Sequence, residues 1–161
     1  MSAPVLRLLD LRKRFRQTLA LDGVSLDIHP GEVVALIGRS GCGKSTLLRC
    51  ASWLDEPDEG FIELEGQPFG RSVSPGGVIR RHTARQVAAM RPRLGFVFQQ
   101  FNLWPHMTAL ENVARGQIVV LGRTRAAAEA KAEALLTRLG LGALLRRHPH
   151  ELSGGERQRV A

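Results

Sequence analysis

The sequence predicts an α/β fold in which strands fill the first half of the chain and helices dominate the second half. Two observations predict it. Residues 33–37 form a continuous apolar run followed at once by a glycine-rich turn and a helical segment, which is typical of a strand in a parallel sheet. From Thr108 onward the chain reads as helical. We therefore expect an α/β core with an appended helical lobe.

The first half contains the expected strands. The segment 5–15 is extended in pattern but irregular, and 24–28 alternates with period two, as a half-buried strand does. Residues 33–37 are rich in β-branched side chains, which indicates a strand buried on both faces. Two more strands are expected over 61–65 and 94–98.

The first helix should follow the glycine-rich turn over about 44–54. Residues 66–93 hold turn residues and arginines, and we expect a loop there, with one helix near 84–90.

Capping residues mark the later helices. Thr108 and Glu111 form a capping box. Thr124 can cap the alanine-rich segment 126–139, which Gly140 ends.

Bulk properties suit one domain of an ordinary globular protein, with 161 residues of which 43% are hydrophobic. No apolar run approaches a membrane span, and Arg7 and Asp10 stand where a signal peptide would be apolar. Two cysteines make neither a disulfide framework nor a zinc site. A cytosolic protein is expected.

The net charge is +8, and the segment 71–93 holds six arginines and no acidic residue. Binding to nucleic acid or anionic lipid is one interpretation, and a solvated arginine-rich surface is the other. The segment lacks the interleaved aromatic residues of a single-strand binding platform, which favours the solvated surface.

Residues 38–46, Gly-Arg-Ser-Gly-Cys-Gly-Lys-Ser-Thr, fit the phosphate-loop pattern G-x-x-x-x-G-K-[ST] in full. Gly38, Gly41 and Gly43 would let backbone N–H groups wrap triphosphate oxygens. Lys44 would place a charge near the β- and γ-phosphates, and Ser45 would offer its hydroxyl to Mg²⁺. The alternative is a glycine-rich turn that binds nothing.

Cys42 lies inside this loop, where a helix N-terminus and Lys44 could lower its pKa and make it a redox-sensing thiol. A small side chain at an unconstrained position is the simpler interpretation. We expect Cys50 on the inner face of the helix, as a core residue.

The last ten residues, Leu-Ser-Gly-Gly-Glu-Arg-Gln-Arg-Val-Ala, open with a capping box from Ser153 to Glu156. Gly154 and Gly155 would let a backbone approach an anion, and Ser153 could donate to it. Taken alone, the motif is also explained as a plain helix cap.

Three ordered motifs together resemble those of ABC-type ATPases, and the resemblance covers essentially the whole chain. Residues 152–158 resemble the signature motif, and Phe96–Gln99 looks like the glutamine loop. Phe15 lies where the family places an aromatic ring that stacks on adenine, usually a tyrosine.

The resemblance implies a P-loop NTPase-type core with an antiparallel β subdomain and a helical subdomain. Residues 1–161 would form a partial nucleotide-binding domain. Its β subdomain and phosphate-loop core would span 1–98, and 99–161 would hold the glutamine loop, helical subdomain and signature motif.

The same resemblance implies the site residues and cofactors, ATP and Mg²⁺. The signature would act on ATP bound by a second, identical subunit. The implied catalytic residues are Gln99, Ser153, Gly154 and Gly155. Those expected to bind nucleotide are Phe15, Gly38, Arg39, Ser40, Gly41, Cys42, Gly43, Lys44, Ser45 and Thr46, and those expected to bind the metal are Ser45 and Gln99.

The family continues past its signature with an apolar strand ending in Asp-Glu and, later, a switch histidine. Asp55-Glu56-Pro57 mimics that ending but follows the helix after the phosphate loop, and none of the five histidines follows the signature. We therefore expect a truncated chain that lacks the C-terminal core strands and hydrolyses ATP very weakly alone.

Residues 99–112 look like the segment after the glutamine loop in importers of polar amino acids. Residues 48–54 also resemble the corresponding segment of those importers. The implied role is an ATP-binding subunit that lies peripherally at the cytoplasmic face of the membrane. A permease would dock near Trp104, and a periplasmic or extracellular solute-binding protein would be an indirect partner. If buried, Trp104 is instead ordinary core.

Two alternatives remain open. The chain could be a non-hydrolysing fragment that binds nucleotide or caps a full-length partner. An ABC ATPase of nucleic-acid metabolism would explain the charge, but the long coiled coils or zinc modules of those families are absent between the motifs, and we expect no nucleic-acid partner.

Overall fold

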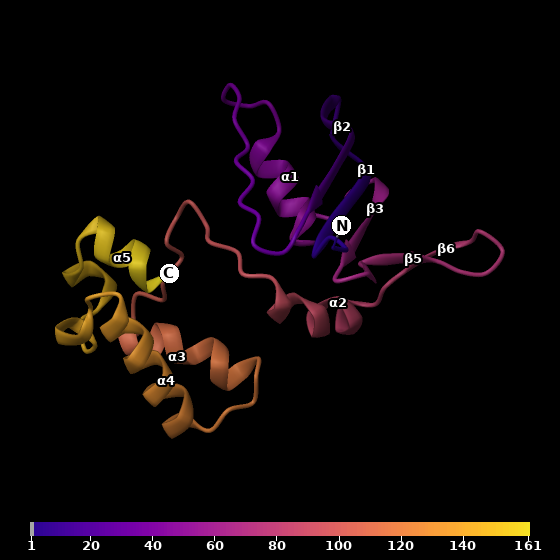
Figure 1. The fold of residues 1–161 in the computed structure, drawn as a ribbon. Helices are drawn as coiled ribbons and strands as arrows, with labels where there is room; N and C mark the ends of the chain where they lie inside the picture. The colour runs from indigo at the N-terminus through magenta and orange to yellow at the C-terminus, as the bar shows by residue number, and fades with distance from the viewer. Residues whose placement is uncertain (1) are drawn as a thin grey trace. The chain divides into compact units, whose positions relative to one another are not determined.

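The computed structural model describes residues 2–161. Residues up to Gly95 form one compact unit and Phe96–Ala161 form a second (Figure 1). The division lies between Gly95 and Phe96, slightly before the predicted division after residue 98. The units are described separately below.

The first unit is built on an antiparallel sheet with strand order β2-β1-β3-β4. The strands are β1 (Leu6–Phe15), β2 (Thr18–Ile28), β3 (Glu59–Leu64) and β4 (Gln67–Phe69). The predicted segment 24–28 lies within β2, and the predicted segments 5–15 and 61–65 each extend one residue beyond β1 and β3.

A bulge explains why β1 looks irregular in sequence. Asp10 has φ 48° and the β1–β2 register shifts between Leu8 and Leu11. An extra residue in one strand moves the following side chains to the other face. Leu8 and Leu11, three residues apart, therefore both point into the core and are buried.

Helix α1 (Lys44–Ala51) packs through Leu47 and Cys50 onto the same core as the sheet and ends earlier than the predicted residue 54. The fully buried thiol of Cys50 confirms its predicted core position. Trp53 and Phe69 also belong to this core, with their ring centroids 5.9 Å apart.

The prediction of a loop over 66–93 is wrong in part. This segment contains β4 and a hairpin of β5 (Arg71–Val73) and β6 (Ile79–Arg81). Strands of three residues are too short to show a period of two. The predicted helix is confirmed as α2 (Ala84–Met90), capped by Thr83 and followed by a 3₁₀ turn over Arg91–Arg93.

The predictions of strands over 33–37 and 94–98 are wrong: neither segment has strand pairing within residues 2–161. A strand exists only when a neighbour accepts and donates its main-chain hydrogen bonds. Val34 and Leu36 face the sheet, where they line a small apolar cavity. Val33 and Ile37 are 94% and 91% exposed.

The second unit is helical, with α3 (Ala109–Val119), α4 (Arg125–Arg138) and α5 (Gly154–Val160). Short 3₁₀ turns cover Gly142–Leu144 and Pro149–Glu151. Its larger apolar cluster joins Ala109, Leu136, Leu141, Leu152 and Val160. In the part of the chain that the structure describes, no helix has the length and apolarity to cross a bilayer.

The predicted caps of this unit are confirmed. Thr108 accepts a hydrogen bond from Glu111 N, and the Glu111 carboxylate accepts one from Thr108 N in return. Thr124 caps α4, and Gly140 follows the helix with φ 74°. The last turn of α4 and the next residues are joined by the Leu141 N to Leu136 O hydrogen bond of 2.8 Å.

Candidate functional site

The predicted phosphate loop curls ahead of α1. Gly38, Gly41 and Gly43 all have positive φ, at 152°, 81° and 94°. Position 43 also has no room for a side chain, because a Cβ there would clash with Ala20 O on β2. No side chain caps α1, so its first N–H groups stay available at the loop.

The loop borders a hollow of about 450 Å³, lined by Ser40, Gly41, Gly43, Lys44, Ser45 and Thr46. The Lys44 ammonium donates to Gly38 O at 2.9 Å and Arg39 O at 2.7 Å, and it lies 3.5 Å from Cys42 Sγ. A cation, a helix N-terminus and free N–H groups in one place suit a polyanion.

Phe15 and the phosphate loop meet the same stretch of β2. Phe15 ends β1 opposite Thr18, and Ala20, two residues further along β2, touches Gly43. The Phe15 ring is 47% exposed, with Lys13 Nζ 5.4 Å from its centroid. An exposed aromatic ring at this end of the unit could stack on a base.

The two thiols differ in environment. Cys42 is exposed inside the loop, whereas Cys50 is buried on α1. Burial raises the pKa of the Cys50 thiol to about 11, which keeps it protonated and unreactive at neutral pH.

In the second unit, Ser153 is the N-cap of α5. Its hydroxyl accepts from Glu156 N at 3.4 Å, and Ser153 N donates to Glu156 Oε2 at 2.6 Å. The hydrogen bond from the Ser153 main chain is the largest cause that lowers the pKa of Glu156. The capping box predicted from the sequence is thus formed.

Gly154 and Gly155 begin α5 without any internal need for glycine. Neither has positive φ. A Cβ on Gly154 would meet nothing within 4 Å, and one on Gly155 would meet only the end of Arg159, at 3.7 Å. The bare backbone therefore faces open space, where an external group could approach it closely.

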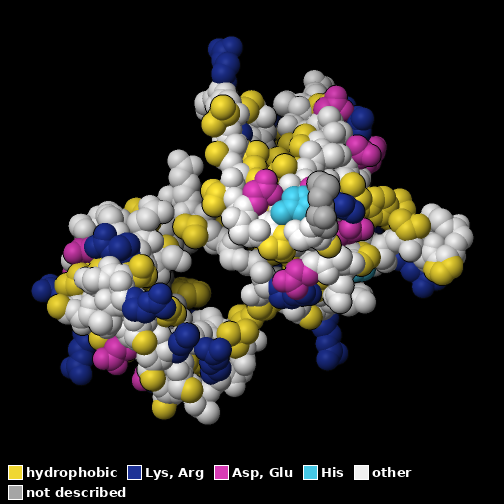
Figure 2. All heavy atoms as spheres, viewed as in Figure 1, with side chains coloured by type: hydrophobic (Ala, Val, Ile, Leu, Met, Phe, Trp, Pro, Cys, Tyr) yellow, Lys and Arg dark blue, Asp and Glu magenta, His cyan; other side chains and the backbone are white. Residues whose placement is uncertain are grey.

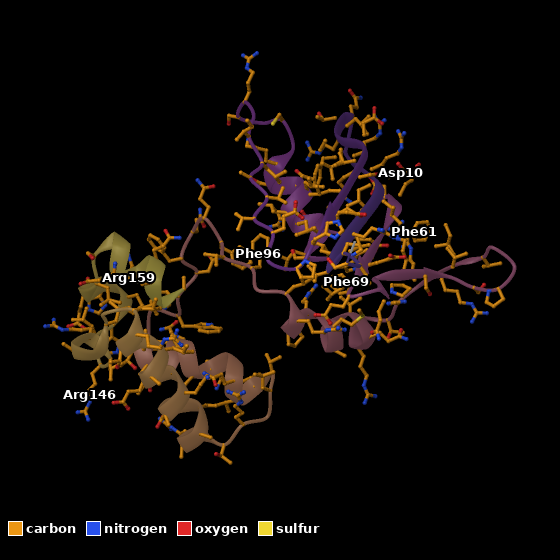
Figure 3. The ribbon with its side chains drawn as sticks, viewed as in Figure 1. Asp10, Phe61, Phe69, Phe96, Arg146 and Arg159 are labelled. Carbon is orange, nitrogen blue, oxygen red and sulfur yellow. The ribbon has the colours of Figure 1, made fainter. Side chains whose placement is uncertain are left out.

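Gln99 also belongs to the second unit, where it is exposed in an irregular segment. The rings of Phe96 and Phe98 pack against each other with centroids 4.7 Å apart, and Figure 3 labels Phe96 at the start of this segment. Gln99 and the signature residues thus share one unit, and the phosphate loop with Phe15 belongs to the other.

Trp104 is 47% exposed, while neighbouring Leu103 packs against the helical core. The loop around Trp104 is fixed by Asn112, a buried residue that sequence reasoning missed. Asn112 Oδ1 accepts from Trp104 N at 2.8 Å, and its Nδ2 donates to the carbonyl oxygens of Trp104, Met107 and Thr108.

Most arginines of the acid-free segment 71–93 are engaged within the first unit. Arg71 is buried; it donates to Asp58 O and Pro57 O and lies 5.4 Å from the Trp53 ring. Burial is the main cause that lowers the pKa of Arg71. Three of the other five form ion pairs or donate to main-chain oxygen: Arg81 with Glu56, Arg93 with Glu65, and Arg91 with Trp53 O.

Asp55 and Glu56, which mimic an Asp-Glu ending in sequence, are engaged elsewhere. Asp55 forms a two-point ion pair with Arg49, at 2.7 and 2.9 Å. This pairing is the main cause that lowers the pKa of Asp55. Glu56 accepts from Arg71 and pairs with Arg81.

Across residues 2–161, no three His, Cys, Asp or Glu side chains are grouped to hold a metal ion. The Ser45 hydroxyl beside the hollow is one oxygen ligand of the kind Mg²⁺ takes. Such a site fits a Mg²⁺ ion that arrives with phosphate oxygens, and not a metal held by the protein alone.

Comparison with known proteins gives one consistent result. The family model described as "ABC transporter" matches residues 21–161. The chain is 43% identical over 158 residues to the octopine permease ATP-binding protein P of Rhizobium radiobacter, covering 98% of this chain and 60% of that protein. It is 44% identical over 152 residues to the arginine/ornithine transport ATP-binding protein AotP of Pseudomonas aeruginosa, covering 94% and 60%.

Solved structures agree. The dimeric structure of MJ0796, a bacterial ABC transporter cassette, superposes with a TM-score of 0.81 at 32% identity, covering 96% of this chain and 66% of that one. The same cassette in a post-hydrolysis dimer bound to ADP and Pi gives a TM-score of 0.78 at 31% identity with the same coverage. The chain spans about 60% of the length of these curated relatives.

Proposed function

Because this chain belongs to the ABC transporter family, we propose that it is the ATP-binding subunit of an importer, coupling ATP binding and hydrolysis to uptake of a polar amino acid through a separate permease. One observation carries the proposal: the loop hollow, in which Lys44 and the first turn of α1 surround space for a polyphosphate.

Each part of the loop has a physical role in binding ATP. The bare backbone of the glycines and the free N–H groups of α1 would donate to phosphate oxygens. Lys44 would exchange two carbonyl contacts for the β- and γ-phosphates. Ser45 would hold Mg²⁺ together with those phosphates, and the ion would neutralise charge on them. The exposed Phe15 ring would stack on adenine.

The signature would act across a dimer. Ser153 and the N–H groups of Gly154 and Gly155 would meet the γ-phosphate bound by the second subunit. The open space at Gly154 supports this role, as does the likeness to dimeric cassettes. Gln99 would respond to Mg²⁺ and the γ-phosphate.

Trp104 would contact the permease, and the hydrogen bonds of Asn112 would fix the loop that presents its side chain. The relatives named for octopine and for arginine/ornithine support a polar, nitrogen-rich solute, delivered by a solute-binding protein. The subunit would then lie at the cytoplasmic face of the membrane. The internal pairing of most arginines in 71–93 argues against nucleic acid as the partner.

A complementation experiment tests the shared site. In Lys44→Ala the subunit loses its own phosphate contact. In Gly154→Asp a carboxylate faces the partner's γ-phosphate, and the open space around Gly154 accommodates it. Each variant alone should fail to form an ATP-dependent dimer in sedimentation, whereas the mixture contains one intact composite site and should regain association.

Binding of a fluorescent ATP analogue to the monomers separates the two roles. Gly154→Asp should bind the analogue as the parent chain does, and Lys44→Ala should bind it roughly 10- to 100-fold more weakly. A mixture that fails to associate, or a Gly154→Asp chain that binds no analogue as a folded monomer, would contradict the arrangement.

A further inference from the structure

The last residue of α3 and the turn that follows it expose three adjacent aliphatic side chains. Val119, Val120 and Leu121 are 61%, 62% and 51% exposed. Their neighbour Ile118 packs inward against the alanine cluster of α3 and α4. The helical core is thus closed without these three residues, which we call the aliphatic tip.

The aliphatic tip is held in place by hydrogen bonds on both of its sides. Val120 N donates to Gly116 O at 2.9 Å, and Arg123 N donates to Gln117 O at 3.1 Å. Arg123 also donates through its guanidinium to Gln117 Oε1 at 2.6 Å. Gly122 makes the turn with φ 65°. The apolar surface is therefore presented by an ordered turn.

Arginines are the only charged residues in the stretch that contains the aliphatic tip, and glutamates flank this stretch at 111 and 129. Residues 112–128 contain three arginines and no acidic residue. Arg125 pairs with Glu129 at 2.6 Å, while Arg123 faces the neutral Gln117 amide. Arg115 has no ion pair with any residue from 2 to 161, and it lines a hollow between α3 and α4 together with Arg125, Glu111 and Glu129.

The geometry points to direct contact of the aliphatic tip with an anionic lipid surface: Val119, Val120 and Leu121 enter the headgroup boundary, and Arg115 and Arg123 meet lipid phosphates. Exposed aliphatic side chains beside unpaired arginines are the combination that binds such an interface. Figure 1 places the turn at the lower end of the helical unit, where Figure 2 shows hydrophobic and basic side chains together.

This contact goes beyond the proposed function, because it involves neither nucleotide nor permease. It would give the subunit an attachment to the membrane of its own. Because arginine attraction to anionic lipid is electrostatic, it should weaken with salt. Each arginine near such a surface should raise affinity about fivefold.

Co-sedimentation of the full chain with vesicles tests the inference. We use phosphatidylcholine vesicles that contain roughly 30 mol% phosphatidylglycerol, an anionic lipid that gives them a negative surface potential. Vesicles of pure phosphatidylcholine serve as the comparison. The parent chain should bind the anionic vesicles and bind much less to the neutral ones. Val120→Asp should abolish the binding, and Arg123→Ala should lower the affinity about fivefold.

Matched controls lie in the same helical unit. Leu139 is 48% exposed beyond α4, so Leu139→Asp makes the same chemical change elsewhere. Arg146 is exposed and projects from the unit in Figure 3, so Arg146→Ala removes a distant charge. Neither control should change vesicle binding.

Equal binding to neutral vesicles, or equal losses in the tip variants and their controls, would overturn the inference. So would failure of the parent chain to bind anionic vesicles, even if it bound a permease through the same residues. Circular dichroism of each variant separates a loss of vesicle binding from misfolding. Binding of the ATP analogue to each variant separates it from failure of the nucleotide site.

Discussion

The ammonium group of Lys44 donates hydrogen bonds to two carbonyl oxygens of its own loop. The side chain contributes to the hollow and not to the core, so we expect Lys44→Ala to leave the unfolding free energy within about 0.5 kcal/mol. Affinity for a fluorescent ATP analogue should fall roughly 10- to 100-fold, since hydrogen bonds to charged groups contribute about 1.5–3 kcal/mol. Lys131→Ala on α4 is the control, and an equal loss there would refute a specific role for Lys44.

Gly154 should show opposite effects on stability and on association. It lies in the first turn of α5 with free space around it, so Gly154→Ala should raise the unfolding free energy by up to about 1 kcal/mol. A methyl group forced into a close dimer contact costs about 1–3 kcal/mol, so ATP-dependent association should weaken. Chemical denaturation and sedimentation measure the two effects; stronger association in the variant would be inconsistent with the proposed role.

Residues whose roles are local could be predicted from sequence, and residues whose roles are tertiary could not. The phosphate-loop glycines and the caps at Thr108 and Ser153 act within a few positions of themselves. Asn112 and Arg71 gave no such signal. Their hydrogen bonds depend on a loop and a turn that only the folded chain brings to them.

At the scale of elements, glutamates at the starts of the helices make the second unit sensitive to acid. Main-chain hydrogen bonds from Thr108 and Ser153 are the largest causes that lower the pKa values of Glu111 and Glu156. A lowered folded-state pKa gives stability that is fully present above the unfolded value of about 4.3 and is lost as the pH falls through the folded value.

We expect the midpoint of urea unfolding to decline between about pH 5 and pH 3. Glu111→Gln should be less stable at neutral pH, because its hydrogen bonds are no longer charge-assisted, but its stability should change less with pH. Glu133→Gln, in the middle of α4, removes the same charge without a cap. If the two variants had identical pH profiles, capping would not be the cause.

Helices were easier to predict than strands for a physical reason. α2, α3 and α4 begin within a residue or two of their predicted starts, because the capping threonines lie beside them in the chain. The segments 33–37 and 94–98 have strand composition, but a strand also needs a partner across its edge. None is formed within residues 2–161.

For the molecule as a whole, the apolar segment 33–37 should govern solubility. Val33 and Ile37 are almost fully exposed on an extended, unpaired stretch, and such a stretch templates pairing between chains. Val33→Lys should reduce concentration-dependent association severalfold in light scattering, with little change in melting temperature. If Leu139→Lys reduced association equally, general charge and not this segment would be responsible.

The contrast between the two cysteines allows nucleotide binding at the loop to be followed by alkylation of a native thiol. With Cys50 sealed in the core and its pKa near 11, a maleimide added at neutral pH should modify one position per molecule, Cys42. That sulfur lies within reach of the Lys44 ammonium, so a nucleotide settling there should shield it. The rate of alkylation would then report the fraction of chains with bound nucleotide, with no substitution in the sequence.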